Sequence, residues 1–197
     1  EAGATRVAIE DSLTYKRHQT FAGALGEGTV TSSNWLVGLR AIKEPAEIER
    51  IAAAQAITDA AFEHILGFIR PGLTESEIAF ELEMFMRKAG AQEVAFTPIV
   101  ASGPNSARPH ALHTSREVRT GEFLKMDFGA RLDDHCSDMT RTICIGQADE
   151  RQREMYAAVL SANLAGIEAA RVAATGVEVD SAARRVLEEA GMGELFI

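Results

Sequence analysis

Hydrophobic and polar positions change their period several times along the chain, and each change marks an expected element. Residues 5–10 (TRVAIE) predict a buried strand, and Asp11 or Ser12 is placed to cap a helix over residues 13–25. Residues 29–37 (TVTSSNWLV) follow a Gly-Glu-Gly turn and favour a second strand. The N-terminal stretch therefore predicts a β-α-β piece, which is too small to be stable alone.

A helical period follows. Apolar residues recur at helical spacing from Pro45, which suits the first turn of a helix, to a break at residues 71–72 (Pro-Gly). Thr74 and Glu77 have the spacing of a capping box. They predict the start of a second helix, which ends near Gly90.

The same order of elements returns near the C-terminus. A long helix is expected over residues 149–174, followed by a shorter one over residues 179–190 that ends at Gly191. The two helix pairs form an approximate internal repeat, although helix pairs punctuated by glycine also arise by coincidence. The first pair continues into strands and the second does not. A sheet built from one copy would keep an open edge, so we expect the sequence to be part of a longer protein.

Three strands are predicted between the helix pairs. Residues 95–102 (AFTPIVAS) precede a loop rich in Gly, Pro and Ser over residues 103–122. Residues 123–128 (FLKMDF) and 139–145 (MTRTICI) then predict an antiparallel hairpin with a polar connection.

Two acids, Asp127 and Asp138, belong to this hairpin. If its turn is centred between Leu132 and Asp133, the two acids face each other with side chains about 5 Å apart. Like charges in that position destabilise a sheet, and one hard divalent cation, or two about 3.5–4 Å apart, is the usual compensation. Alternatively, one Asp points to solvent and the other caps a turn, and a single bulge would offset the pair.

The histidines divide by context. His110 lies in the Gly- and Pro-rich loop, where an imidazole is suited to donate to a developing oxyanion or to orient a carbonyl, or is simply exposed. His113 and His135 have no partner at metal-ligand spacing and favour surface or supporting roles. His18 and His64 fall within helical patterns and are expected to be structural.

Other polar residues of the hairpin have supporting roles. Asp133 and Asp134 are expected to form the turn rather than to bind metal. Thr140 and Thr142 share a strand face with Asp138 by two-residue alternation, where their hydroxyls are suited to orient carboxylates. Plain β-propensity accounts for these threonines equally well.

Composition narrows the function classes. The 197 residues are 46% hydrophobic and 25% charged, which is typical of a soluble globular chain, and the net charge of −9 argues against a nucleic-acid partner. No apolar run approaches the eighteen or so residues of a membrane span and no leader pattern begins the sequence, so we expect a cytoplasmic protein without a membrane partner. Cys136 and Cys144 are expected to be reduced core thiols. Motifs for nucleotide binding and serine hydrolases are absent from the sequence.

Taken together, the segments MDFGARLDDHCSDMTRT, SGPNSARPHAL, LRAIKEPAEIERIAAAQAITDAAF and RPGLTESEIAFELE resemble the Xaa-Pro aminopeptidase and Xaa-Pro dipeptidase branch of the creatinase/methionine aminopeptidase superfamily. The most specific part is the two acids eleven residues apart, ending in S-D-x-T-R-T. The resemblance implies an α+β pita-bread fold. Residues 1–41 would be the end of the N-terminal domain, and residues 42–197 the first half of the pseudo-twofold catalytic domain.

The same resemblance implies a metal-dependent exopeptidase that removes an N-terminal residue preceding proline. Two divalent ions, Mn²⁺ or Co²⁺, would be held by Asp127, Asp138 and a His and two Glu that have no counterpart in this sequence. His110 matches the loop histidine that stabilises the tetrahedral intermediate. The implied partner is a peptide with proline at its second position, and a homodimer fits the family. We expect weak metal binding and no activity from these 197 residues alone.

Two alternatives remain. A metal-free creatinase-type hydrolase lacks the paired acids, so retention of Asp127 and Asp138 argues against it. A non-catalytic pita-bread module that binds proteins typically loses metal ligands. Whether the parent protein carries the His and Glu ligands absent from this sequence would distinguish such a module from an enzyme. Locally, Asp134 and His135 stand where the family often has Gly-Tyr, and His113 stands where a proline or an acid is usual; both differences concern the substrate loops.

Overall fold

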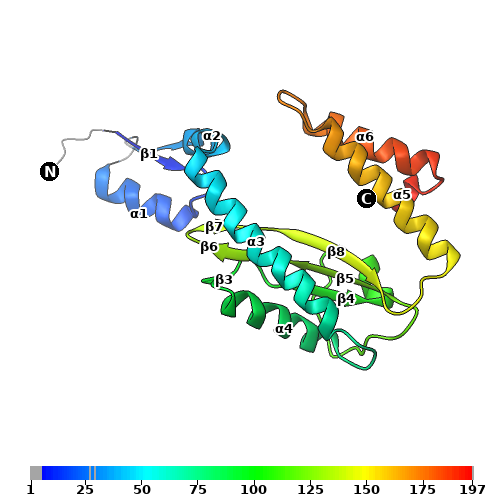
Figure 1. The fold of residues 1–197 in the computed structure, drawn as a ribbon. Coiled ribbons are helices and arrows are strands. Elements are labelled where there is room, and N and C mark those ends of the chain that lie inside the picture. The colour runs from blue at the N-terminus through cyan, green and yellow to red at the C-terminus, as the bar shows by residue number, and fades with distance from the viewer. Residues whose placement is uncertain (1–5, 27, 29, 197) are drawn as a thin grey trace. The chain divides into compact units, whose positions relative to one another are not determined.

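The computed structural model describes residues 6–26, 28 and 30–196 (Figure 1). The chain divides into two compact units, Glu1–Ala53 and Ala54–Ile197, and each is described by itself. The domain boundary expected at residue 41 stays a prediction. Among the described residues, no helix is both long and apolar enough to cross a membrane.

The first unit contains the expected β-α-β piece and a further short helix. Its elements are β1 Val7–Glu10, α1 Tyr15–Leu25, β2 Val30–Ser33 and α2 Trp35–Ala41. The strands are parallel, with Val7 opposite Val30. The predicted Thr5 and Thr29 ends of the two strands lie outside the described residues.

Three details of this unit were predicted wrongly. Helix α1 begins after Thr14 rather than after Asp11 or Ser12. Strand β1 alternates half-buried and exposed residues instead of being buried. The second strand ends at Ser33, and the apolar residues that follow form α2, because a short apolar run fits a helix as well as a strand.

The remaining elements begin with α3, whose first residues belong to the first unit. They are α3 Pro45–Phe68, α4 Glu75–Lys88, β3 Glu93–Val94, β4 Ile99–Ser102, η1 Gly103–Ala107, β5 Phe123–Phe128, β6 Ala130–Leu132, β7 His135–Cys136, β8 Met139–Cys144, α5 Glu150–Ala169, α6 Gly176–Glu189 and η2 Gly193–Leu195. Two antiparallel sheets form, in the orders β4-β5-β8 and β3-β6-β7.

The helix caps follow the sequence signals. The capping box of Thr74 and Glu77 is present at α4, and an equivalent box of Thr175 and Glu178 starts α6. Helices α4 and α6 have the same length of 14 residues, while the long helices α3 and α5 have 24 and 20, and the internal repeat stays a prediction. Helix α5 ends at Ala169, short of the predicted end.

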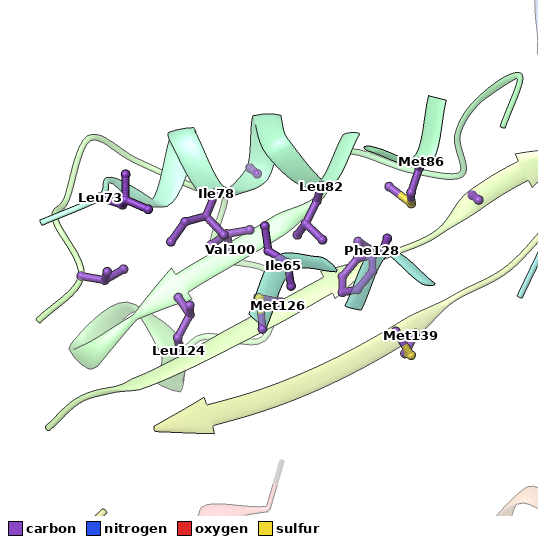
Figure 2. Packing of buried hydrophobic residues seen from close by; sticks show 14 of the residues in the cluster. Ile65, Leu73, Ile78, Leu82, Met86, Val100, Leu124, Met126, Phe128 and Met139 are labelled. Atoms are coloured by element: carbon purple, nitrogen blue, oxygen red, sulfur yellow. The ribbon is translucent and has the colours of Figure 1, made fainter. Parts of the chain in front are cut away.

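The core fixes the orientation of the central strand β5. Helix α4 places Ile78, Leu82 and Met86 on one face at four-residue spacing, and these side chains are fully buried (Figure 2). They belong to the same cluster as Met126 and Phe128 of β5, which are also fully buried. Burial of each such side chain stabilises the fold by about 1.5–3 kcal/mol, so the inward face of β5 is strongly specified.

Candidate functional site

The pleat of β5 presents a polar face opposite the core. Leu124, Met126 and Phe128 are fully buried, while the residues between them are half-buried. Because side chains alternate along a strand, Lys125 and Asp127 share the other face. The apolar alternation thus determines which side of the sheet carries the first predicted acid.

The second acid lies diagonally from the first. Asp127 pairs with Thr140 of β8 and with Ile99 of β4, and Asp138 precedes Thr140 by two residues. The predicted direct opposition of Asp127 and Asp138 is therefore wrong by two residues. An even shift keeps the face, so Asp138 remains on the same side of the hairpin as Asp127.

Turn chemistry explains this correction. The two-residue turn between β6 and β7 is formed by Asp133 and Asp134, both with positive φ (47° and 62°), as in a type I′ turn. Its centre lies one residue beyond the predicted position between Leu132 and Asp133, and this displaces the pairing by two. The prediction that Asp133 and Asp134 form the turn is confirmed.

The electrostatics of the acid pair are unfavourable without a cation. Burial raises the pKa of Asp127, and the neighbouring charge of Asp138 and a hydrogen bond with it raise this pKa further. The hydrogen bond from Thr140 and the charge of Lys125 act in the opposite direction. The expected orienting role of Thr140, which lies directly opposite Asp127, stays a prediction.

One carboxylate oxygen of this pair has no partner. Asp127 Oδ1 is buried and accepts no hydrogen bond from any residue that the structure describes. A buried oxygen that accepts no hydrogen bond costs folding free energy. The neighbouring carboxylate of Asp138 adds charge repulsion to this cost. The pair is suited to bind a divalent cation. Within the described part of the chain, however, no group of three or more His, Cys, Asp or Glu side chains is arranged to hold one.

Small buried groups hold the backbone between the two acids. Ser137 Oγ lies 2.6 Å from Thr58 Oγ1 of α3 and accepts a hydrogen bond of 2.9 Å from Ala130 N. A Cβ added at Gly129 would lie 2.0 Å from the carbonyl oxygen of Ser137, so only glycine allows this close approach. Sequence analysis missed these residues; the available signal is two small residues near the acids, Gly129 two residues after Asp127 and Ser137 directly before Asp138.

The loop that carries His110 is fastened by a buried acid, Glu75, at the start of α4. Its Oε1 accepts hydrogen bonds from Ser102 N (2.7 Å) and Oγ (2.9 Å), and its Oε2 from Thr114 N (3.0 Å) and Oγ1 (2.6 Å). Asn105 donates to the same carboxylate. Burial acts to raise the pKa of Glu75, but these hydrogen bonds together hold it below its ordinary value.

The predicted histidines have different surroundings. His110 is exposed in the loop after η1, and its role stays a prediction. His113 Nδ1 lies 3.1 Å from Ser76 Oγ, and His135 Nδ1 lies 2.7 Å from Asp133 O. His64 is paired with a carboxylate oxygen of Glu81 at 2.6 Å, in agreement with a structural role, and His18 lies on α1 as predicted.

The two cysteines are free, as predicted. Their predicted core position is wrong for Cys136, which is exposed, while Cys144 is half-buried. Cys136 lies in the short strand β7 beside the turn, where little apolar cover is available.

These residues together form an antiparallel sheet that packs against a helix on one face and carries two acids on the other. Residues 49–197 match the model of metallopeptidase family M24, and the chain belongs to this family. The predicted family and its α+β pita-bread fold are thereby confirmed.

Named relatives agree with this assignment. The chain is 40% identical over 159 residues to an Xaa-Pro dipeptidase of Pyrococcus furiosus, covering 81% of this chain and 46% of that protein. Among solved structures, an Xaa-Pro dipeptidase from Bacillus anthracis is 42% identical with a TM-score of 0.90, covering 96% of this chain and 54% of that one. A prolidase from Pyrococcus furiosus has a TM-score of 0.91 at 36% identity, covering 96% and 56%. The chain spans about half the length of the curated relatives it matches.

Proposed function

We propose that this protein acts as a divalent-metal-dependent exopeptidase that removes an N-terminal residue preceding proline, as an Xaa-Pro dipeptidase or aminopeptidase. The observation that carries the proposal is the buried, unpartnered Oδ1 of Asp127 beside Asp138. Membership of metallopeptidase family M24 and the names of the relatives support it. A cytoplasmic location and a homodimer belong to the same proposal.

Asp127 and Asp138 would hold the divalent ions, Mn²⁺ or Co²⁺, and Thr140 would orient the Asp127 carboxylate. Such ions lower the pKa of water and polarise a carbonyl group. His110 would donate a hydrogen bond to the scissile carbonyl oxygen as negative charge develops there. An amide to proline has no N–H, so peptidases that recognise this donor do not act on it.

The domain organisation follows from the same proposal. Residues 1–41 would be the end of an N-terminal domain, and residues 42–197 would be the first half of the catalytic domain. The two carboxylates provide only part of a site, because hard divalent ions take about six donors. We therefore expect weak Mn²⁺ binding and no turnover from these 197 residues alone.

The test combines metal titration with a peptidase assay. Calorimetric titration of the 197-residue chain with Mn²⁺ should give an affinity weaker than micromolar, and no hydrolysis of an Xaa-Pro dipeptide. Micromolar binding with turnover would contradict the incomplete site. A protein that carries this chain at the length of its relatives should hydrolyse the dipeptide with added Mn²⁺. It should lose that activity with Asp138→Asn and keep it with Asp133→Asn.

The alternatives give different results in this assay. A creatinase-type hydrolase would keep activity without metal and after Asp138→Asn. A non-catalytic module would show no hydrolysis at any metal concentration. Both are disfavoured by the retention of two acids whose mutual repulsion has no structural purpose without a cation.

A further inference from the structure

Lys125 connects the central strand to the backbone immediately before His110. Its Nζ donates hydrogen bonds to the carbonyl oxygens of Arg108 (2.5 Å) and Pro109 (3.0 Å), and His110 is the next residue. Lys125 lies on β5, two residues before Asp127 and on the same face. The contact thus joins a loop to a strand position 16 and 17 residues away.

A lysine is unusual at this position. β5 is the middle strand of its sheet, and Lys125 pairs with Ala101 on one side and Thr142 on the other. Lys125 is half-buried, and a partly buried lysine is costly unless its donors find acceptors; two successive carbonyls of the exposed loop supply them here. Hydrogen bonds from a charged donor are about twice as strong as neutral ones.

The loop is otherwise held mainly at its ends. Glu75 binds Ser102 and Asn105 before the His110 segment and Thr114 after it. Between these points, Arg108 N donates a backbone hydrogen bond to Asn105 O (3.1 Å), and Ala111 N donates a long one to Arg108 O (3.4 Å). After His110, Ala111 packs in a small buried cluster with Ile99 and Ala101 of β4. Before His110, Lys125 supplies the polar fastening of the Arg108–Pro109 backbone to the sheet.

We propose that Lys125 is a positioning residue, which fixes the Arg108–Pro109 backbone and so holds His110 beside the face of β5 that carries Asp127. The anchoring concerns this chain alone. Its consequence for catalysis rests on the proposed function, in which His110 acts on the substrate carbonyl.

The anchoring is tested by NMR on the 197-residue chain. In the wild type, the amide of His110, which follows the bound Pro109 carbonyl, should have an order parameter near the rigid value of about 0.85. Lys125→Met keeps most of the stem but removes the donors, and should lower this value below about 0.6. Lys125→Arg should restore order, since a guanidinium donates to both carbonyls. The matched control Lys88→Met, at the exposed end of α4, should leave the loop unchanged.

Three NMR results would overturn the anchoring by Lys125. A loop equally ordered in Lys125→Met and wild type overturns it, and so does a loss of order spread over the whole sheet. Failure of Lys125→Arg to restore order has the same meaning. If the Met variant does not fold, the wild type and Lys125→Arg decide. A His110 order parameter below about 0.6 in the wild type overturns the anchoring, and a value near 0.85 in both proteins supports it.

A kinetic readout separates this proposal from the proposed function. In an active protein at the length of the relatives, Lys125→Met should lower kcat by about tenfold to a hundredfold with a small change in KM. Mn²⁺ affinity should be no weaker than in the wild type, because the substitution removes a positive charge near Asp127. An unchanged kcat overturns the positioning role. If no peptidase activity exists at all, the proposed function fails, while the NMR result still decides the anchoring.

Discussion

Asp138 lies two residues from the position directly opposite Asp127, on the same face of the β5–β8 pair. The two carboxylates are close enough for the charge of Asp138 to raise the pKa of Asp127. In the metal-free chain this arrangement costs stability, because repulsion between the acids is relieved only by protonation or by a cation.

Asp138→Asn should stabilise the metal-free chain. Removing one of two neighbouring like charges is worth roughly 0.2–1 kcal/mol in a sheet, and Asp138 is exposed, so screening favours the lower end. Chemical denaturation at pH 7 with a chelator present measures the effect. Asp133→Asn removes the same charge at the turn, where Asn is well tolerated at positive φ, and is the control.

The gain from Asp138→Asn should depend on pH. The pKa of Asp127 is raised above its ordinary value, so the ionised form is disfavoured in the folded state. Stability therefore falls as pH rises through the ordinary and then the raised pKa. The gain should vanish at low pH, where Asp127 is protonated. An equal gain at all pH values would contradict repulsion as the cause.

Glu75→Gln should destabilise the chain by about 2–4 kcal/mol, because a buried amide cannot satisfy the donors of Ser102 and Thr114 as a carboxylate does. The pKa of Glu75 is below its ordinary value, so its contribution is present above that ordinary value and is lost as pH falls through the folded pKa. Denaturation series from pH 7 to pH 3 should show a smaller acid loss in the variant.

Glu83→Gln, on the same helix, is the matched comparison. Glu83 forms a surface ion pair with Arg87, and such pairs contribute about 0–1 kcal/mol. Similar losses for Glu75→Gln and Glu83→Gln would show that the buried network around Glu75 carries no special stability.

The elements of the fold were predictable where their signals are local. The capping box of Thr74 and Glu77, Pro45 at its helix start and the alternation along β5 each lie within a few residues of one another. Tertiary packing agrees with them, so the sequence pattern sufficed. The register was not predictable in this way, because one residue in the position of the turn at Asp133 and Asp134 decides it.

The site was predictable only in part. Asp127 and Asp138 stand out because acids are rare in strands, and His110 stands out by its loop. Lys125 and Glu75 gave no such signal, since their partners are 16 to 39 residues away along the chain. A charged residue in a strand or at a helix start has many ordinary explanations, and only the folded chain identifies its acceptors and donors.

Removing the hydroxyl of Ser137 should destabilise the chain more than removing the hydroxyl of Thr58. Ser137→Ala removes the nearer acceptor of Ala130 N and leaves a buried donor poorly satisfied, which costs about 1–3 kcal/mol. Thr58→Val keeps that acceptor, and Ser137 Oγ still has Ala130 O at 3.2 Å, so about 1 kcal/mol or less is expected. Urea denaturation of both variants gives the order; equal losses would argue against the assignment of Ala130 N to Ser137.

Gly129→Ala should both destabilise the chain and disturb the acid pair. The added Cβ would lie 2.0 Å from the backbone oxygen of Ser137, and since a backbone atom cannot swing away, the strands must separate. Overpacking of this kind costs up to about 3 kcal/mol. Gly67→Ala, in α3 with open space at its Cβ, should instead gain up to about 1 kcal/mol. Because Ser137 precedes Asp138, Gly129→Ala should also remove the pH-dependent gain in stability that Asp138→Asn produces. A double-mutant cycle measures this coupling. A full gain from Asp138→Asn in the Gly129→Ala background would show that this close approach does not position the acids.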